Sequence, residues 1–406
     1  MTSKRTTAKF WYKHMDYGKR LNPEVLNMKP SGIRKFFDIA EQMQDVISLG
    51  VGEPDFATPW KIRAAGIDAL EQGKTKYSAN RGTLRLRESV AEYMNKKFHL
   101  SYDPAEEILI TVGGSEAIDA ALRAMISPGD EVIIPQPSYV CYEPMTALAG
   151  GVPVIIETKA EDEFKLTARD LKAALTPKTK ALILPYPCNP TGAIMEKKDL
   201  EEIAEVLRGT DVFVISDEIY AELTFGGVKH VSIASLPGMR ERTVVVNGFS
   251  KAFSMTGWRL GFAVGPKEII AQVTKIHQYA IMCAPTLSQN AAVTALTECD
   301  EDVQEMLEEY DMRRRFIVSG FTELGLTCRN PRGAFYAFPC IASTGMTSEE
   351  FCEALLAEQH VALVPGTAFG KGGEGFVRAS YCYSVAHIKE ALRRIGEFLK
   401  NRNLEK

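Results

Sequence analysis

The sequence predicts an α/β protein with a mainly parallel central sheet and a second, smaller α+β lobe. Three observations lead to this prediction. From about residue 45 to residue 290, short apolar runs alternate with helical patterns, which is typical of βα units in a parallel sheet. Glycine or polar residues directly follow several of these runs, at the edge where such a sheet binds ligands. Beyond about residue 291, shorter strand patterns alternate with long helical ones.

Each expected strand is a short apolar run, and each expected helix repeats apolar residues at helical spacing. The strands expected in the first part are Val46–Leu49, Ile108–Val112, Glu131–Pro135, Val152–Thr158, Lys180–Pro185, Val212–Ser216, Thr243–Val246 and a run ending at Gly265. Two of the helices expected there are recognised by one apolar face each: Ile33, Phe36, Phe37 and Ala40 in the first, and Ala117, Ile118, Ala121, Leu122 and Met125 in the second. Two further helical regions are expected at Asp199–Leu207 and from Pro266 to Thr297. In the second part we expect helices over Glu301–Phe321, 347–358 and 385–399, with strands at Ala334–Phe338, Val361–Val364 and Phe376–Tyr383.

Composition and charge exclude several classes of function. The chain has 406 residues, 45% hydrophobic and 25% charged, so it has ample material for a large core. Its formal net charge of −4 gives no global attraction to nucleic acid or membrane. The eight cysteines show no C-x-x-C pair and no metal-ligand spacing with the six histidines, so no metal is expected. No apolar run is long enough to span a membrane.

The first twenty residues contain six Lys or Arg and one acid, Asp16, without the apolar run of a secretory signal. We therefore expect a cytoplasmic protein whose basic arm is disordered or lies against a partner. A transit peptide has a similar composition and is the alternative.

One lysine, Lys251, follows the strand pattern Thr243–Val246 and is flanked by small and apolar residues. Burial disfavours the charged form of lysine and lowers its pKa, and an uncharged amine is a nucleophile. Such an amine can hold the aldehyde of pyridoxal phosphate (PLP) as a Schiff base. Arg259 lies eight residues further on, within a second apolar run. The alternative is a surface lysine just past the end of a strand.

A glycine pair separates the strand pattern Ile108–Val112 from the following helix, in the string GGSEA at 113–117. Free N–H groups and the positive end of the helix dipole make such a helix start a site for anions. Neither this string nor GTAFGKGG at 366–373 has the spacing of a P-loop. The G-x-G at 50–52 is not a dinucleotide motif, because Pro54 follows and the third glycine is missing.

Further polar residues follow strands: Tyr139, Asn189 in an N-P-T-G turn, and Asp217. An aspartate that closes a buried strand is costly unless a cation faces it. The pyridinium N–H of PLP is one such cation, and at about 4 Å with an effective dielectric near 20 the pair is worth roughly 4 kcal/mol. The alternative is a structural aspartate in a salt bridge.

The string SKAFSMTGWRLGF at 250–262 resembles the lysine signature of class I/II aminotransferases, which are fold-type I PLP enzymes. GEPDF at 52–56, KTKYSANRG at 74–82, GGSEA, NPTG at 189–192, DEIY at 217–220 and GFVRASY at 375–381 resemble the same family. The resemblance extends from about Ser31 to the end of the chain. It implies a fold-type I enzyme with a large PLP-binding domain over 46–290 and a small domain that combines 1–45 with 291–406.

The resemblance also implies a role for each candidate residue. Lys251 would carry PLP, Asp217 would face the ring nitrogen, Tyr139 would stack on the ring, and Asn189 and Tyr220 would contact its phenolic oxygen. The remaining cofactor contacts would be Gly114, Ser115, Glu116, Ser250 and Arg259, with Tyr77 reaching the phosphate of the neighbouring subunit. Gly52 and Arg378, with Asn189, would bind the substrate, Arg378 through its α-carboxylate. Some relatives place a serine ligand for the phosphate where this chain has Gly248, and Ser250 or Ser115 would compensate.

The implied activity is transfer of the amino group of an aromatic, neutral or aspartate-type L-amino acid to a 2-oxo acid such as 2-oxoglutarate, by a homodimer with shared active sites. The string GIRKFFDIA is most similar to aromatic and broad-range members, which favours aromatic or neutral donors over aspartate. The family also often has cis peptide bonds where this chain has Gln136–Pro137 and Asn189–Pro190. Two alternatives remain at this stage: a PLP-dependent carbon–sulfur lyase on the same scaffold, and a non-enzymatic PLP-sensing regulator. The regulator would need a DNA-binding domain, for which the roughly 30 residues before the similar region are too few.

Overall fold

The computed structural model describes residues 16–28, 30, 32, 43 and 45–402. The helical face expected at Ile33, Phe36, Phe37 and Ala40 lies outside these residues. The chain divides into two compact units, residues 1–30 and residues 31–406. In the first unit, η1 (Tyr17–Lys19) is followed by α1 (Pro23–Asn27), and the side chain of Asn22 caps α1 by accepting from the N–H of Glu24 at 2.9 Å. The predicted domain boundaries at 45/46 and 290/291 stay a prediction.

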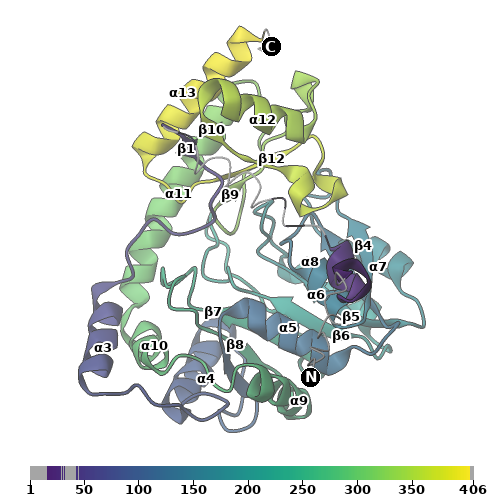
Figure 1. Cartoon of the computed structure of the whole chain (residues 1–406), viewed down its shortest axis with the longest axis vertical. Helices are drawn as coiled ribbons and strands as arrows, with labels where there is room; N and C mark the ends of the chain where they lie inside the picture. Colours follow the sequence, from purple (N-terminus) through teal and green to yellow (C-terminus); the bar gives the residue numbers. More distant parts are fainter. Residues whose placement is uncertain (1–15, 29, 31, 33–42, 44, 403–406) are drawn as a thin grey trace, which may run out of the picture. The chain divides into compact units, whose positions relative to one another are not determined.

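A seven-stranded sheet forms the centre of the second unit (Figure 1). Its strands, from one edge to the other, are β2 (Ile108–Thr111), β8 (Gly261–Val264), β7 (Thr243–Gly248), β6 (Phe213–Asp217), β5 (Thr179–Leu184), β3 (Glu131–Gln136) and β4 (Val152–Glu157). Only β8 runs antiparallel to its neighbours, and every other pairing in this sheet is parallel. The prediction of a mainly parallel sheet is therefore confirmed.

Alternating strand residues face two different layers of helices, as the period of two in a strand requires. Leu109, for example, packs with α5 (Gly114–Met125), α6 (Tyr142–Leu148) and α9 (Lys267–Ala280), whereas its neighbours Ile108 and Ile110 pack with α4 (Leu84–Phe98). On β3 and β5, Ile133 and Leu182 face α7 (Ala168–Ala174) and α8 (Lys197–Leu207). Both faces of the sheet are thus covered, which explains why its strands read as continuous apolar runs.

The helical region expected from Pro266 to Thr297 is two helices in the structure, α9 and α10 (Thr286–Glu298). The break lies at 281–285, where Met282 has a φ of 74° and Pro285 precedes α10. Because Pro285 has no N–H and restricts the residue before it, the first helix cannot continue through this point. Helix α3 (Trp60–Glu71) packs against α10.

The C-terminal part is built as the predicted α+β lobe. The long helix α11 (Asp300–Glu323) leads into a three-stranded sheet in the order β11 (Val364–Pro365), β12 (Val377–Ser380), β9 (Tyr336–Ala337). Helices α12 (Ser348–Gln359) and α13 (Val385–Asn401) cover it, with Phe351 of one packed edge-on against Phe398 of the other. Short 3-10 helices occur in both parts of the second unit. Those before β7 are η2 (Ile233–Ser235) and η3 (Arg240–Arg242), and those in the C-terminal lobe are η4 (Ala342–Thr344), η5 (Gly366–Phe369) and η6 (Lys371–Gly373).

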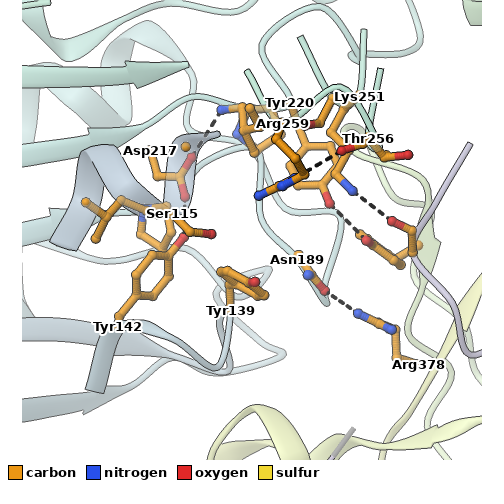
Figure 2. Close-up of a pocket in the computed structure, with 18 residues that line it drawn as sticks. Ser115, Tyr139, Tyr142, Asn189, Asp217, Tyr220, Lys251, Thr256, Arg259 and Arg378 are labelled. Carbon is orange, nitrogen blue, oxygen red and sulfur yellow. Dashed lines mark hydrogen bonds between the residues drawn. The ribbon is translucent and has the colours of Figure 1, made fainter. Parts of the chain in front are cut away.

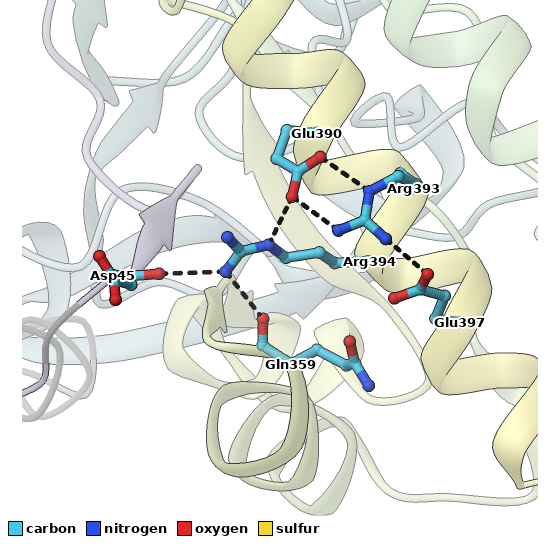
Figure 3. Close-up of polar contacts among 6 residues, drawn as sticks. All are labelled: Asp45, Gln359, Glu390, Arg393, Arg394 and Glu397. Carbon is cyan, nitrogen blue, oxygen red and sulfur yellow. Dashed lines mark hydrogen bonds and ion pairs between the residues drawn. The ribbon is translucent and has the colours of Figure 1, made fainter.

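The segment around β1, at the start of the second unit, is attached to the C-terminal lobe. Strand β1 (Ile47–Ser48) pairs in parallel with β10 (Val361–Ala362). Next to it, Arg394 of α13 donates to the carbonyl oxygens of Asp45 at 3.0 Å and Gln359 at 3.2 Å, and Glu390 orients the guanidinium (Figure 3). One arginine thus joins the chain before β1 to the end of α12, and places the following Gly50–Asp55 segment against the lobe.

Both expected cis peptide bonds, Gln136–Pro137 and Asn189–Pro190, are confirmed, and Tyr186–Pro187 is a third. None of the helices in the described residues is long and apolar enough to cross a membrane. In the same residues, no group of three or more His, Cys, Asp or Glu side chains could hold a metal ion.

Candidate active site

The strands of the central sheet end around a cavity of about 300 Å³ (Figure 2). Its lining contains most of the residues that the sequence predicted, although they lie up to 326 positions apart, from Gly52 to Arg378. The predicted residues in the lining are Gly52, Gly114, Ser115, Tyr139, Asn189, Asp217, Tyr220, Ser250, Lys251, Arg259 and Arg378. Tyr77 and Glu116 do not line it.

The topology of the sheet explains this convergence. Strands β2, β3, β5, β6 and β7 point the same way, so the residues after them, among them Ser115, Tyr139 and Asn189, meet at one edge. Strand β8 runs the opposite way and therefore begins at this edge. Arg259, two residues before β8, thus faces the same cavity as Lys251, three residues after β7.

Lys251 lines the cavity. Its Nζ donates to the carbonyl oxygen of Gly52 at 2.8 Å and lies 6.0 Å from the centre of the Tyr220 ring and 5.7 Å from that of Phe335. Burial lowers the pKa of Lys251. The structure therefore contains the lysine with depressed pKa that the sequence predicted.

Asp217 ends β6 at the base of the cavity and is buried. Tyr142 donates to its Oδ2 at 2.7 Å, and the N–H of Ile219 donates to its Oδ1 at 3.2 Å. Burial raises the pKa of Asp217, and these two hydrogen bonds offset part of that rise. No ion pair joins Asp217 to a lysine, arginine or histidine of the described residues, so the alternative of a structural salt bridge has no partner there.

Arg378 faces Asn189 across the cavity and donates to its Oδ1 at 2.8 Å (Figure 2). A second N–H of Arg378 bonds the carbonyl oxygen of Gly50, and the guanidinium lies between the rings of Tyr336 and Phe369, at 4.5 and 4.7 Å. Its Nε is buried without a hydrogen-bond partner, and burial lowers the pKa of the group. No carboxylate of the described residues forms an ion pair with Arg378, which leaves a buried cation open to an anionic ligand.

Tyr336, on β9, contacts several predicted residues although the sequence did not single it out. Its hydroxyl lies 2.9 Å from that of Tyr220, and its ring stacks on Arg378. A Cβ on Gly52 would lie 2.0 Å from the Tyr336 hydroxyl, so only glycine fits at that position. Burial raises the pKa of both phenols.

The start of α5 forms an open anion site next to Arg259. Gly113 precedes the helix with a φ of 79° and has no side chain to cap it, so the first N–H groups of α5 are left for a ligand. Both Ser115 and Ser250 line the cavity. At Gly248, a Cβ would lie 3.0 Å from the Cα of Gly261 and 3.1 Å from Ile219, so little room exists for the serine of some relatives.

The two predicted residues outside the lining have other environments. Tyr77 is 82% exposed in the turn before α4. Glu116 is directed to the N–H of Val112 and to Nδ1 of His277.

Several residues of the lining could not be selected from the sequence. Tyr142 and Ile118 lie on helices, and Thr256 lies in the loop between Lys251 and Arg259. Pro185, Pro187, Ile219 and Tyr336 complete the set. Thr256 and Ile219 lie inside recognised strings, and Tyr142 lies three residues after Tyr139, so the available signal was their place beside the predicted residues.

The comparisons with known proteins agree with this site. The family model "Aminotransferase class I and II" matches residues 44–395. The Bacillus subtilis (strain 168) protein YugH, which carries an aminotransferase name, is 53% identical over 93% of this chain and 98% of its own length. An aspartate aminotransferase of Pyrococcus abyssi is 49% identical over 93% of this chain and 97% of its own. Among solved structures, an aromatic aminotransferase from Pyrococcus horikoshii superposes with a TM-score of 0.87 and 48% identity, covering 91% of this chain and all of its own.

These relatives give no support to the lyase or to the regulator alternative. With the family model matching most of the chain, and with whole-length relatives near 50% identity, the chain belongs to the family of class I and II aminotransferases.

Proposed function

We propose that this aminotransferase binds pyridoxal 5′-phosphate through Lys251 and moves the amino group of an L-amino acid to a 2-oxo acid such as 2-oxoglutarate. When bound, the cofactor supplies an aldehyde that takes up the amino group and a ring that accepts the electron pair from the substrate's Cα. The observation that carries the proposal is one cavity in which three features lie together: a lysine with depressed pKa, a buried aspartate with no ion-pair partner among the described residues, and an uncapped helix start.

The residues of the cavity fit this cofactor group by group. The N–H groups of Gly114 and Ser115, with Ser250 and Arg259, suit a phosphate. Asp217 suits a protonated ring nitrogen, because a cation opposite a buried carboxylate compensates its desolvation. For the remaining contacts, Tyr139 offers an aromatic face, while Asn189 and Tyr220 offer donors for a phenolic oxygen.

The chain's own residues would then divide the chemistry between them. Lys251, whose pKa burial lowers, attaches the cofactor and later removes the proton from the substrate's Cα as general base. Arg378 holds the α-carboxylate with two parallel N–H donors, and its contacts to Asn189 and Gly50 fix its plane. The N–H of Gly52 reaches the same carboxylate, which its missing Cβ permits.

For the donor we propose an aromatic or neutral amino acid rather than aspartate. In the described lining the cations are Lys251, Arg259 and Arg378, and each already has a role. None of them is left for the side-chain carboxylate of aspartate. The names of the relatives include both aspartate and aromatic aminotransferases, so an amino-acid panel decides the point.

We also propose that the enzyme is a cytoplasmic homodimer with shared active sites, in which Tyr77 reaches the phosphate of the partner's cofactor. Exposed apolar side chains support the interface: Trp60, Ile67 and Leu70 on α3, Tyr279 in the last turn of α9, and Ile281 and Met282 directly after it. The turn that carries Tyr77 is tied to this second group, because Asn80 donates to the carbonyl oxygen of Met282 at 2.8 Å. An apolar surface that is exposed in a single chain is usually covered by another chain in the assembly.

The test begins with the absorption spectrum of the purified protein, which should show a visible band from the bound cofactor. Borohydride should fix the cofactor on the peptide that contains Lys251, and labelling of a different lysine would contradict the proposal. A panel of amino acids with 2-oxoglutarate then tests specificity. Faster turnover of aspartate than of phenylalanine or tyrosine would overturn the proposed donor preference but not the aminotransferase activity.

A further inference from the structure

Glu116 is the third residue of α5 and its carboxylate faces away from the cavity. Oε2 accepts from the backbone N–H of Val112, and Oε1 lies 2.5 Å from Nδ1 of His277 on α9. Val112 immediately precedes Gly113 and so belongs to the turn between β2 and α5. One carboxylate therefore connects the turn of the anion site to a second helix.

His277 is fully buried, and α9 packs directly against α5. An ionised carboxylate only accepts hydrogen bonds, so Nδ1 of His277 must donate to Glu116. The other ring nitrogen, Nε2, is buried with no hydrogen-bond partner in the described residues. A hydrogen there would be a buried N–H without a partner, so a hydrogen on Nδ1 is favoured over one on Nε2. The pair is thus a fixed donor and acceptor rather than a solvated surface contact.

The turn contains one hydrogen bond of its own, from Oγ1 of Thr111 to the carbonyl oxygen of Gly113 at 2.9 Å, and this bond does not hold Val112. Gly113 has a φ of 79° and no side chain, so it neither caps α5 nor restricts the backbone as another residue would. It also lies close to Arg259, whose guanidinium would be 2.8 Å from a Cβ at this position. The direction of the N–H groups of Gly114 and Ser115 consequently depends on what holds Val112.

We propose that Glu116 and His277 are positioning residues for the cofactor phosphate: the pair fixes Val112 and thereby aims the start of α5 at the phosphate. This inference rests on the proposed function, which places the phosphate at that helix start. It gives Glu116 an indirect role in place of the direct cofactor contact expected from the sequence, and it gives His277 a role that no recognised string indicated.

A purely structural pair would hold α5 against α9 without affecting the phosphate in particular. The two roles differ in one measurable quantity, the preference of the apoenzyme for PLP over pyridoxal, which lacks the phosphate. Loss of packing weakens both ligands alike. Loss of aim at the phosphate weakens PLP and leaves pyridoxal unchanged.

The experiment measures dissociation constants of PLP and pyridoxal for the full-length apoenzyme by absorbance titration, and repeats the PLP titration with inorganic phosphate as competitor. His277→Leu removes the donor, and His277→Asn keeps an amide donor near the position of Nδ1. Glu116→Gln keeps the shape of the side chain but can no longer accept from both partners, so it provides a second route if His277→Leu does not fold. Far-UV circular dichroism and thermal unfolding of each apoenzyme establish folding.

The chain offers a matched control in a second buried pair. His230, whose side chain is 8% exposed, lies 2.8 Å from the fully buried carboxylate of Glu218. That pair stands beside Asp217 rather than at the start of α5. His230→Leu removes the same kind of donor with a similar loss of packing, so the preference of this variant for PLP over pyridoxal should stay that of the wild type.

We expect His277→Leu and Glu116→Gln to reduce the preference for PLP over pyridoxal by about tenfold, the low end for loss of a hydrogen bond to a charged group. His277→Asn should recover most of it, and inorganic phosphate should compete less well with PLP in the two defective variants. An equal loss for both ligands, or an unchanged preference in folded variants, would overturn the inference. If wild type itself bound PLP no better than pyridoxal, the proposed phosphate site would fail instead.

Discussion

Replacement of Tyr142 by phenylalanine should make cofactor binding more sensitive to acid. Tyr142 donates to Oδ2 of Asp217 at 2.7 Å, and this bond stabilises the ionised carboxylate against the burial that raises its pKa. Tyr142→Phe keeps the ring and removes only the donor. A hydrogen bond to a charged group contributes about 1.5–3 kcal/mol. Since one pKa unit corresponds to about 1.4 kcal/mol, loss of this bond should raise the pKa of Asp217 by about one to two further units.

Under the proposed function, PLP binding needs Asp217 ionised opposite the ring nitrogen, so the pH below which PLP affinity falls should move upward by about one to two units. The assay is absorbance titration of the apoenzyme with PLP over a series of buffers from acid to mildly alkaline pH. Tyr139→Phe is the matched control, because Tyr139 packs edge-on against Tyr142 at 5.9 Å but donates no described hydrogen bond to Asp217. An acid limb that stays in place in Tyr142→Phe would refute the reasoning.

The same variant has a consequence for the stability of the apoenzyme. A carboxyl whose pKa is higher in the folded chain contributes stability that is present below its unfolded pKa and is lost as the pH rises through its folded pKa. For Asp217 this loss begins near the ordinary value of 3.8. In Tyr142→Phe it should continue to higher pH, so urea unfolding should show a deficit of about 1.5–3 kcal/mol at neutral pH that narrows on acidification.

Three further outcomes test other parts of the site. Gly52→Ala should strongly impair substrate binding, because its Cβ would lie 2.0 Å from the Tyr336 hydroxyl. The double variant Gly52→Ala/Tyr336→Phe should recover part of the binding, and no recovery would contradict the steric account. Arg378→Lys should raise KM for the amino acid by about tenfold or more, since a lysine cannot form the bidentate pair, with PLP affinity unchanged as the control. Tyr77→Phe should weaken PLP binding by roughly ten- to a hundredfold, and mixing its subunits with Lys251→Ala subunits should restore activity through hybrid dimers with one intact site; hybrids that form without any activity would place Tyr77 outside the partner's site.

Much of the site could be predicted because its chemistry is concentrated at strand ends. Lys251 and Asp217 each follow a continuous apolar run, and a parallel sheet brings such positions to one edge whatever their separation in sequence. The sheet itself was predictable for the same reason, since strands buried on both faces are apolar throughout. The antiparallel direction of β8 was not predicted, although it places Arg259 in the cavity.

The rest depended on tertiary contacts that no local pattern encodes. Tyr142 lies on a helix and reaches Asp217 across the sheet, and Tyr336 comes from a two-residue strand of the C-terminal lobe. The break between α9 and α10 was missed because apolar spacing continues across residues 281–285. Glu116 was expected among the cofactor contacts from its place in GGSEA, but only the position of His277 shows where its carboxylate points.

The segment 249–260 has both ends fixed, since Gly248 and Gly261 are paired across β7 and β8. Between them lie Ser250, Lys251 and Arg259, so a single inserted or deleted residue would turn one cation away from the cavity by changing the register of β8. In enzyme engineering, residues 249–260 should therefore be replaced together and without a change in length. Changes in substrate range are better sought in β9, which contributes Tyr336 to the cavity and carries neither Lys251 nor Arg259.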